Sequence, residues 1–291
     1  MSSAVVTVRA LSKRYGRTVA IADVSLDVYE GEIFGLIGPN GAGKTTTMEC
    51  IQGSRLADGG TISVLGLDPR RDSTALRRRI GVQHQEAQLQ KRIKVWEALD
   101  LWASLYDRDS VVDSNALLDR LGLAGKRDTR FMNLSGGQKQ RLFIALALIH
   151  RPELVFLDEL TTGLDPQARR AIWELVRDIR ARGSTVFLTT HLMEEAERLC
   201  DRVAIIEHGR VIEMGTPLEL VARHCPQRCV FYSTDEQDGE RQHELRGEGD
   251  DFVTEVIHRI ARDGAHVRGF RTELPTLEDV FLKLTGRAIR D

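Results

Sequence analysis

The 291-residue chain has no long hydrophobic run, few cysteines and almost no excess of charge of either sign. Its longest uninterrupted apolar stretch, residues 142–149, has eight residues, whereas a membrane-spanning helix needs about 20. We therefore expect no segment of the chain to cross a membrane. The first residues lack the basic region and apolar core of a secretory signal peptide, so a cytoplasmic protein is expected.

Charge and cysteine content argue against two further classes of protein. Lys plus Arg number 41 and Asp plus Glu 43, which gives a net charge of −2. Nucleic-acid-binding proteins normally carry a basic excess, so no nucleic-acid partner is expected. Of the four cysteines (Cys50, Cys200, Cys225 and Cys229), only the last two are close, and no second pair is present to complete a zinc site. We expect free thiols.

Strand-like and helix-like segments alternate along most of the chain, after a β-rich start at residues 4–37. Strands are expected at residues 32–37, 61–65, 80–84, 153–157 and 185–190, with a hairpin at 203–214. Helices are expected at residues 44–52, 136–150, 166–182 and 192–200. This alternation predicts an α/β fold with a mainly parallel sheet covered on both faces. A stretch with apolar residues at spacings of three and four interrupts it at about residues 86–135, and predicts an inserted helical subdomain.

The end of the chain differs in composition from the rest. Residues 235–251 carry eight acidic and two basic side chains with three glycines, which predicts an exposed loop or linker. Beyond it, residues 252–262 and 276–285 are helix-like and 266–271 strand-like. We therefore expect a large domain over residues 1–225 and a small α+β accessory domain over 226–291.

A glycine-rich turn follows the predicted strand that ends at residue 37. Gly38-Pro-Asn-Gly-Ala-Gly-Lys44-Thr45 matches the P-loop pattern G-x-x-x-x-G-K-[ST] and opens a predicted helix. Its glycines allow successive N–H groups to point at phosphate oxygens, and the positive end of the helix adds to the attraction. Lys44 supplies a full charge for the β and γ phosphates, and the Thr45 hydroxyl can bind Mg²⁺. A turn that merely closes a strand–helix unit is the alternative.

Two carboxylates, Asp158 and Glu159, end a later apolar strand. A pair of acids after a hydrophobic strand is common and has little meaning alone. With a P-loop upstream, the pair predicts a magnesium–nucleotide site. Asp158 would hold the magnesium ion, directly or through water, and Glu159 would polarise the attacking water.

The octapeptide Leu134-Ser-Gly-Gly-Gln-Lys-Gln-Arg141 resembles the signature motif of ABC ATPases. Other family elements occur in the family's order. Tyr15 resembles the aromatic residue that stacks on adenine, and Gln85 resembles the lid glutamine, for which Gln83 is a competitor. Residues 163–165 (Gly-Leu-Asp) resemble the loop that communicates between paired subunits, and His191 resembles the switch histidine at the γ-phosphate.

The resemblance implies a P-loop ABC ATPase core with an N-terminal β subdomain, an inserted helical subdomain and a C-terminal accessory domain. It implies that ATP and Mg²⁺ are the cofactors. It assigns nucleotide binding to Tyr15, Gly38, Asn40, Gly41, Gly43, Lys44, Thr45, Thr46, Ser135 and Gly137. It assigns catalysis to Glu159, His191 and Gln85, and metal binding to Thr45, Gln85 and Asp158.

Family resemblance also implies partners. In this family the P-loop of one subunit is completed by the signature motif of another, so a dimer with itself or with a similar chain is expected. The translocation path would belong to an integral membrane subunit on a separate chain, which would hold this protein at the cytoplasmic face of the membrane. The tail, Leu274–Gly286, resembles the ATPase subunits of bacterial daunorubicin exporters, which predicts export of hydrophobic compounds or drugs.

Two alternatives to a transport ATPase stay open. One is a non-transport ABC ATPase that acts in translation or on DNA, although the chain has neither a second cassette nor long coiled coils. The other is a slow nucleotide-binding regulator, suggested by Leu160, which stands where the family usually has proline after the catalytic glutamate. A leucine does not fix the backbone φ angle there.

Overall fold

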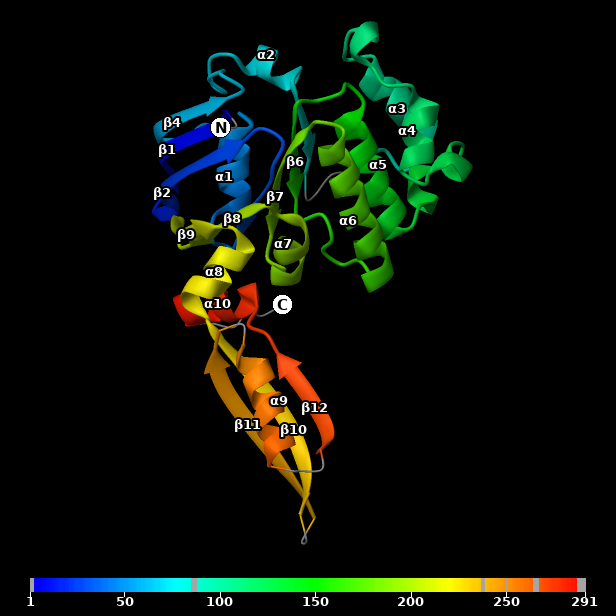
Figure 1. The fold of residues 1–291 in the computed structure, drawn as a ribbon. Helices are drawn as coiled ribbons and strands as arrows, with labels where there is room; N and C mark the ends of the chain where they lie inside the picture. Colours follow the sequence, from blue (N-terminus) through cyan, green and yellow to red (C-terminus); the bar gives the residue numbers. More distant parts are fainter. Residues whose placement is uncertain (1–2, 85–87, 237–238, 250, 264–266, 287–291) are drawn as a thin grey trace. The chain divides into compact units, whose positions relative to one another are not determined.

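The computed structural model describes residues 3–84, 88–236, 239–249, 251–263 and 267–286 (Figure 1). The chain divides into two compact units, Met1–Gly215 and Thr216–Asp291. This division falls before helix α8 (Pro217–His224), whereas the sequence suggested residue 225. The reason is that α8 packs with α10 (Leu277–Thr285) of the second unit.

A nine-stranded sheet forms the framework of the first unit, and it confirms the predicted α/β class. Strands β8, β3, β7, β6 and β5 are parallel neighbours. Strand β9 pairs antiparallel with β8 and parallel with β2, and β2, β1 and β4 are antiparallel neighbours. The predicted terminal hairpin is confirmed as β8 and β9. Across the sheet the strands are β4 (Gly59–Val64), β1 (Ala4–Tyr15), β2 (Thr18–Tyr29), β9 (Arg210–Gly215), β8 (Arg202–Glu207), β3 (Ile33–Ile37), β7 (Thr185–Thr190), β6 (Leu154–Asp158) and β5 (Ile80–Gln83).

The central parallel strands have apolar middles because both faces of the sheet are covered there, and the polar residues of β6 and β7 stand at the strand ends. Every residue of β3, β6 and β7 is buried. Phe187 on β7 packs between Phe34 on β3 and Phe156 on β6, with ring centroids 5.5 and 5.6 Å apart. The order β3–β7–β6 places the carboxyl ends of three strands side by side, which is where ligands bind in open parallel sheets.

Helices lie beside this sheet, and further helices occur within residues 86–135, where the sequence predicted an inserted helical subdomain. Figure 1 shows α3 and α4 beside α5. The helices and short 3₁₀ turns of the first unit are α1 (Lys44–Ile51), α2 (Ser73–Arg77), α3 (Val95–Ala103), η1 (Arg108–Ser110), α4 (Ser114–Arg120), η2 (Ala124–Lys126), η3 (Phe131–Asn133), α5 (Gly136–Leu148), α6 (Pro166–Ala181) and α7 (Met193–Leu199). In the part of the chain that the structure describes, no helix has the length and apolar character needed to span a bilayer.

The second unit corrects one prediction. Residues 239–248, expected in a loop, form strand β11 (Gly239–Glu248), which pairs antiparallel with β10 (Gln227–Glu236); β12 (Val267–Glu273) pairs with the other side of β10. Charged residues fit this strand because they alternate with half-buried His243, Leu245 and Gly247. A Cβ atom on Gly247 would lie 2.1 Å from the Phe252 ring, so glycine lets α9 (Phe252–Arg262) approach β11.

Candidate functional site

The P-loop lies between β3 and α1, as the sequence predicted. Gly41 and Gly43 have φ angles of 81° and 104°, which side chains rarely tolerate. A Cβ atom on Gly43 would also lie 2.5 Å from the Ala20 carbonyl oxygen. Asn40 is exposed within this loop, and Thr46 is half-buried in the first turn of α1. Glycine is therefore required at position 43 by both the backbone conformation and the close approach of β2.

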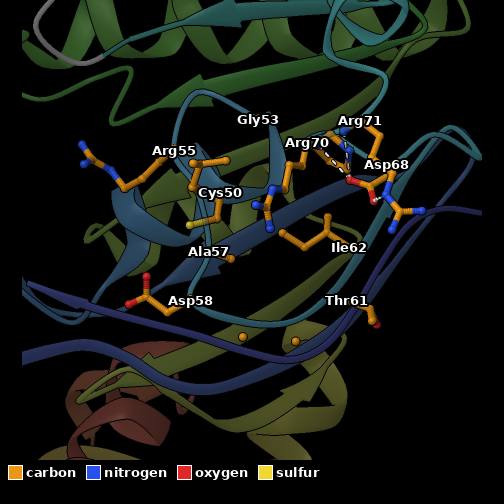
Figure 2. A pocket seen from close by; sticks show the side chains of 14 residues that line it. Cys50, Gly53, Arg55, Ala57, Asp58, Thr61, Ile62, Asp68, Arg70 and Arg71 are labelled. Carbon is orange, nitrogen blue, oxygen red and sulfur yellow. Dashed lines mark hydrogen bonds and ion pairs between the residues drawn. The ribbon is translucent and has the colours of Figure 1, made fainter.

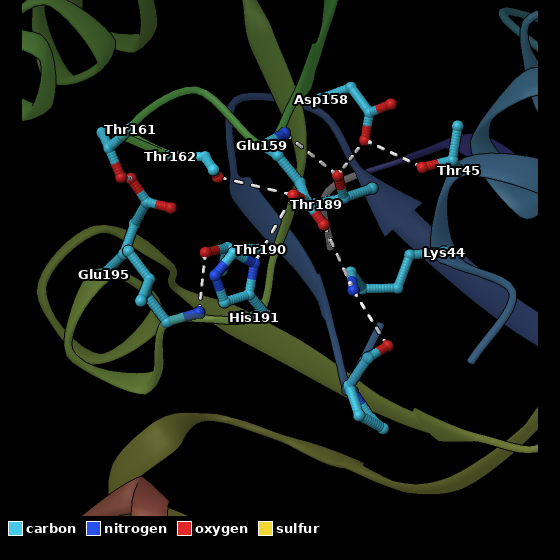
Figure 3. Close-up of polar contacts among 12 residues, drawn as sticks. Lys44, Thr45, Asp158, Glu159, Thr161, Thr162, Thr189, Thr190, His191 and Glu195 are labelled. Atoms are coloured by element: carbon cyan, nitrogen blue, oxygen red, sulfur yellow. Dashed lines mark hydrogen bonds and ion pairs between the residues drawn. The ribbon is translucent and has the colours of Figure 1, made fainter. Parts of the chain in front are cut away.

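Lys44 is the first residue of α1, and its side chain is only 4% exposed. Its Nζ donates to the carbonyl oxygens of Gly38 (2.9 Å) and Pro39 (3.1 Å) and lies 3.4 Å from Glu159 Oε1 (Figure 3). Burial lowers the pKa of Lys44, and the neighbouring carboxylates of Glu159 and Asp158 act in the opposite direction. The loop thus surrounds a buried amine with oxygen acceptors.

Asp158 ends β6 and is 3% exposed. Its Oδ1 accepts a hydrogen bond from Thr189 Oγ1 on the neighbouring strand β7 and lies 3.4 Å from Thr45 Oγ1 on α1. Burial raises the pKa of Asp158, and the Thr189 and Thr45 hydroxyls lower it. Sequence reasoning missed Thr189; the available signal was its place in the Thr-Thr-His run at the end of a predicted strand.

Glu159 follows directly and has a φ angle of 46°, unusual for a residue with a side chain. Its backbone N–H donates to the Thr189 carbonyl oxygen (3.1 Å), and its Oε2 lies 3.5 Å from His191 Nδ1. Hydrogen bonding from His191 lowers the pKa of Glu159, burial opposes this, and the charge of Lys44 lowers the pKa further. Glu159 is therefore held as a carboxylate, the form that can accept a proton.

The donor set suits a magnesium ion. The Thr45 hydroxyl and the Asp158 carboxylate are hard oxygen ligands, which Mg²⁺ prefers, and they already face each other.

Of the two candidate lid glutamines, Gln83 is 2% exposed and both polar atoms of its side chain are hydrogen-bonded within the protein. Its Oε1 accepts from Asp158 N (3.1 Å), and its Nε2 donates to the His84 carbonyl oxygen (2.6 Å). Gln85, the preferred lid residue, lies outside the described residues.

Tyr15 lies at the end of β1 and is 41% exposed. The Arg55 guanidinium and the Lys13 ammonium lie 5.2 and 5.7 Å from its ring centroid. Arg55 also lines a polar hollow of about 640 Å³ after α1, together with Asp58 and Arg70 (Figure 2). The residues predicted to bind nucleotide are not among those that line this hollow, so it is separate from the P-loop site.

Ser135 and Gly137 lie at the start of α5. The exposed Ser135 caps this helix, because its Oγ accepts from Gln138 N (3.3 Å) while its own N–H donates to Gln138 Oε1 (3.0 Å). The contacts above unite Lys44, Thr45, Asp158, Glu159 and His191 from three strand ends. Ser135 instead makes its capping bonds within α5, so the structure does not join it to that group.

Comparisons with known proteins agree on one family. Residues 21–162 match the family model for ABC transporters. The chain is 38% identical over 307 residues to the Nod factor export ATP-binding protein I of Cupriavidus pinatubonensis, covering 99% of this chain and 93% of that protein. It is 40% identical over 304 residues to the same-named protein of Rhizobium johnstonii, covering 99% and 96%.

Solved structures give the same result for the fold. An ATP-binding subunit of an ABC transporter superposes with a TM-score of 0.67 and 31% identity, over 75% of this chain and 92% of that one. The cbiO1 protein of Clostridium perfringens, part of the ABC transporter complex cbiONQ, has a TM-score of 0.67 and 29% identity, over 75% and 91%.

Proposed function

The chain belongs to the ATP-binding subunits of ABC transporters, and from that premise we propose that it hydrolyses ATP with Glu159 as general base to drive export by a membrane subunit. Members of this family hydrolyse ATP to power transport, so the reaction is phosphoryl transfer to water. The observation that carries the proposal is the convergence of Lys44, Asp158, Glu159 and His191 at adjacent strand ends.

The P-loop and α1 would bind the phosphates of ATP. Backbone N–H groups of Gly41 and Gly43 and the N-terminus of α1 attract the anion, and Lys44 adds a full charge at the β and γ phosphates. The Thr45 hydroxyl and Asp158 carboxylate would hold a magnesium ion, which neutralises charge that develops on the phosphate oxygens. Tyr15 provides an exposed ring for the adenine.

Proton transfer falls to Glu159. Its lowered pKa keeps it ionised, so it can take a proton from the attacking water. His191 lies beside Oε2 of this carboxylate and Lys44 beside Oε1, so His191 would orient the carboxylate toward that water while also facing the γ-phosphate. Electrostatic stabilisation by Lys44 and positioning by His191 then supply most of the catalysis, as phosphoryl transfer requires.

A second subunit would complete each ATP site. The start of α5 carries an exposed serine, and helix N-termini bind anions through free N–H groups. Because Ser135 and Gly137 are not joined to the P-loop of their own chain, we assign them to the γ-phosphate at the P-loop of a partner. The working unit would be a dimer with two composite sites.

A second hollow provides a place for the membrane subunit. It has a volume of about 460 Å³ and is lined by aromatic side chains, including Trp102, Tyr106 and Phe143, and by polar ones such as Gln52 and Arg77. His84 and Gln88, which precede and follow Gln85 in the sequence, also line it. We assign this hollow to a segment of the membrane subunit, which would keep the protein at the cytoplasmic face of the membrane.

Export is the proposed direction of transport. Both sequence relatives described above are named as export proteins, and the C-terminal tail resembles daunorubicin-exporter subunits. A hydrophobic compound or drug is the proposed cargo.

Two measurements test this function. Lys44→Ala should reduce ATP hydrolysis by at least about 100-fold, because the charge of Lys44 stabilises the transition state. An unchanged rate would overturn the proposed ATP site.

The membrane subunit should co-purify with wild-type protein and not with Trp102→Arg, which places a charge in the second hollow. Leu56→Arg, an exposed leucine that lines the hollow of Figure 2, is the matched control. Equal recovery with both variants would exclude this docking place.

A further inference from the structure

A buried carboxylate lies next to the catalytic group without belonging to it. Glu195 on α7 is 2% exposed. Its Oε1 accepts two hydrogen bonds, from Thr161 Oγ1 (2.8 Å) and from Trp173 Nε1 (2.9 Å); Figure 3 shows Glu195 beside Thr161. Burying a carboxylate is expensive unless it is hydrogen-bonded, so such a group needs a reason to be there.

The two bonds join three segments that follow the catalytic strands. Thr161 is two residues beyond Glu159, in the turn after β6. Glu195 is four residues beyond His191, in the helix that follows β7. Trp173 lies on α6, the helix that follows the turn after β6. The turn that carries Glu159 is therefore tied to the helix that follows the switch histidine.

This turn needs to be held in place. Glu159 has a positive φ angle, a conformation that persists only where the surroundings impose it. On one side its backbone N–H is fixed by the Thr189 carbonyl oxygen. The next residue in the chain is Leu160, which does not fix its backbone φ angle as a proline would. The next residue, Thr161, is where the side-chain bond to Glu195 begins.

We propose that Glu195 is a positioning residue, which fixes the Glu159–Thr161 turn against α7 and so sets the orientation of the Glu159 carboxylate relative to His191. The proposal rests on the proposed role of Glu159 as the base. Small displacements of a catalytic group reduce rates steeply, so loosening this turn lowers the rate of cleavage more than the affinity for ATP.

The test compares substitutions that change one bond to the same oxygen atom. Thr161→Val keeps the shape and removes the donor in the turn, whereas Thr161→Ser keeps a donor. Trp173→Phe removes the other donor, which does not lie in the turn. For each variant we would measure kcat, the dissociation constant for ATP and the midpoint of thermal unfolding.

We expect Thr161→Val to lower kcat about ten-fold or more while the ATP dissociation constant stays within about two-fold. Thr161→Ser should have a kcat close to that of the wild type. For an equal loss of thermal stability, Trp173→Phe should lower kcat less than Thr161→Val does. Glu195→Gln, which keeps an acceptor oxygen, should be far more active than Glu195→Ala.

Two results would overturn the positioning role: an unchanged kcat in Thr161→Val, or a fall in kcat that follows lost thermal stability equally in Thr161→Val and Trp173→Phe. Glu159→Gln, measured in parallel, separates this failure from failure of the proposed function. If Glu159→Gln retains hydrolysis, the assignment of the base is wrong. If it abolishes hydrolysis while Thr161→Val is fully active, only the role of Glu195 is wrong.

Discussion

Two neighbouring carboxylates have opposite electrostatic surroundings. Asp158 is enclosed, and burial raises its pKa, with hydroxyl groups as its hydrogen-bond donors. Glu159 has a lowered pKa because His191 and Lys44 face it. The contacts of the two acids also differ, since Asp158 faces the Thr45 hydroxyl whereas Glu159 faces Lys44 and His191. These different neighbours are the reason that we propose Asp158 as the metal ligand and Glu159 as the base.

Replacing Glu159 by glutamine tests this division at the residue scale. The amide keeps the shape but cannot take up the proton, so hydrolysis should fall by about 100-fold or more while ATP binding is retained. Turnover and the ATP dissociation constant would be measured together. Glu194→Gln, at an exposed glutamate on α7, should behave like wild type. Near-normal turnover in Glu159→Gln would mean that the base lies elsewhere.

At the scale of elements, α5 is joined to β5 through a buried histidine. His150 follows α5, is 4% exposed and stacks on Tyr106 with ring centroids 4.0 Å apart. Its Nε2 is 2.9 Å from the Ile80 carbonyl oxygen, and among the described residues its Nδ1 has no hydrogen-bond partner. Burial lowers the pKa of His150, because a charged ring is less stable inside the protein than in water. The proton added at Nδ1 would also have no hydrogen-bond acceptor among the described residues.

This histidine should make the fold sensitive to mild acid. Below the ordinary histidine pKa of about 6.5, the unfolded chain takes up a proton that the folded chain refuses, so the free energy of unfolding falls as the pH falls. The loss ends once the pH passes the lower pKa of the folded state. His150→Gln keeps a donor for Ile80 and cannot titrate. Between pH 7.5 and 5.5, wild type should lose about 1 kcal/mol more than His150→Gln in urea denaturation. Equal losses would contradict this expectation.

At the scale of the whole molecule, the candidate catalytic residues and the second compact unit are separate in the chain. Every residue assigned to phosphate, metal or catalysis comes before position 192, and the second unit begins at Thr216. The second unit has its own sheet, with Val230, Val256 and Phe281 buried. Nucleotide chemistry and the accessory unit are therefore expected to be independent.

A chain that ends at Gly215 should bind ATP with an affinity close to that of the full chain. Its dimer or its association with the membrane subunit should be the property that changes. The measurements are ATP affinity by calorimetry and assembly by size-exclusion chromatography. Loss of ATP binding in a truncated chain with intact circular dichroism would contradict the independence of the two units.

Mixed dimers test the composite sites. Lys44→Ala and Ser135→Arg should each inactivate a homodimer, because both sites of that dimer contain a lesion. In a mixed dimer one site contains both lesions and the other contains neither. Mixing should therefore recover part of the hydrolysis, and less than half if the sites cooperate. Cross-linking would verify that mixed dimers form; verified mixed dimers without activity would contradict sites that work independently.

The sequence by itself determined the elements whose signals are local. A P-loop requires glycines, lysine and threonine at fixed spacing between a strand and a helix, and this pattern predicted the turn that the structure shows between β3 and α1. Alternating strands and helices predicted the α/β class, because continuous apolar runs indicate strands buried on both faces. The prediction of a loop or linker at residues 235–251 was wrong, because the composition alone did not reveal that half-buried residues alternate with charged ones within this stretch.

The tertiary structure decided which strand ends meet. Hydrophobic periodicity identifies a strand but not its neighbour, since strand pairing depends on contacts between residues far apart in the chain. The order β3–β7–β6 is what places Thr189 against Asp158 and His191 against Glu159. The same long-range packing brings Thr161, Trp173 and Glu195 to one buried oxygen atom, and their spacing along the chain gave no signal of it.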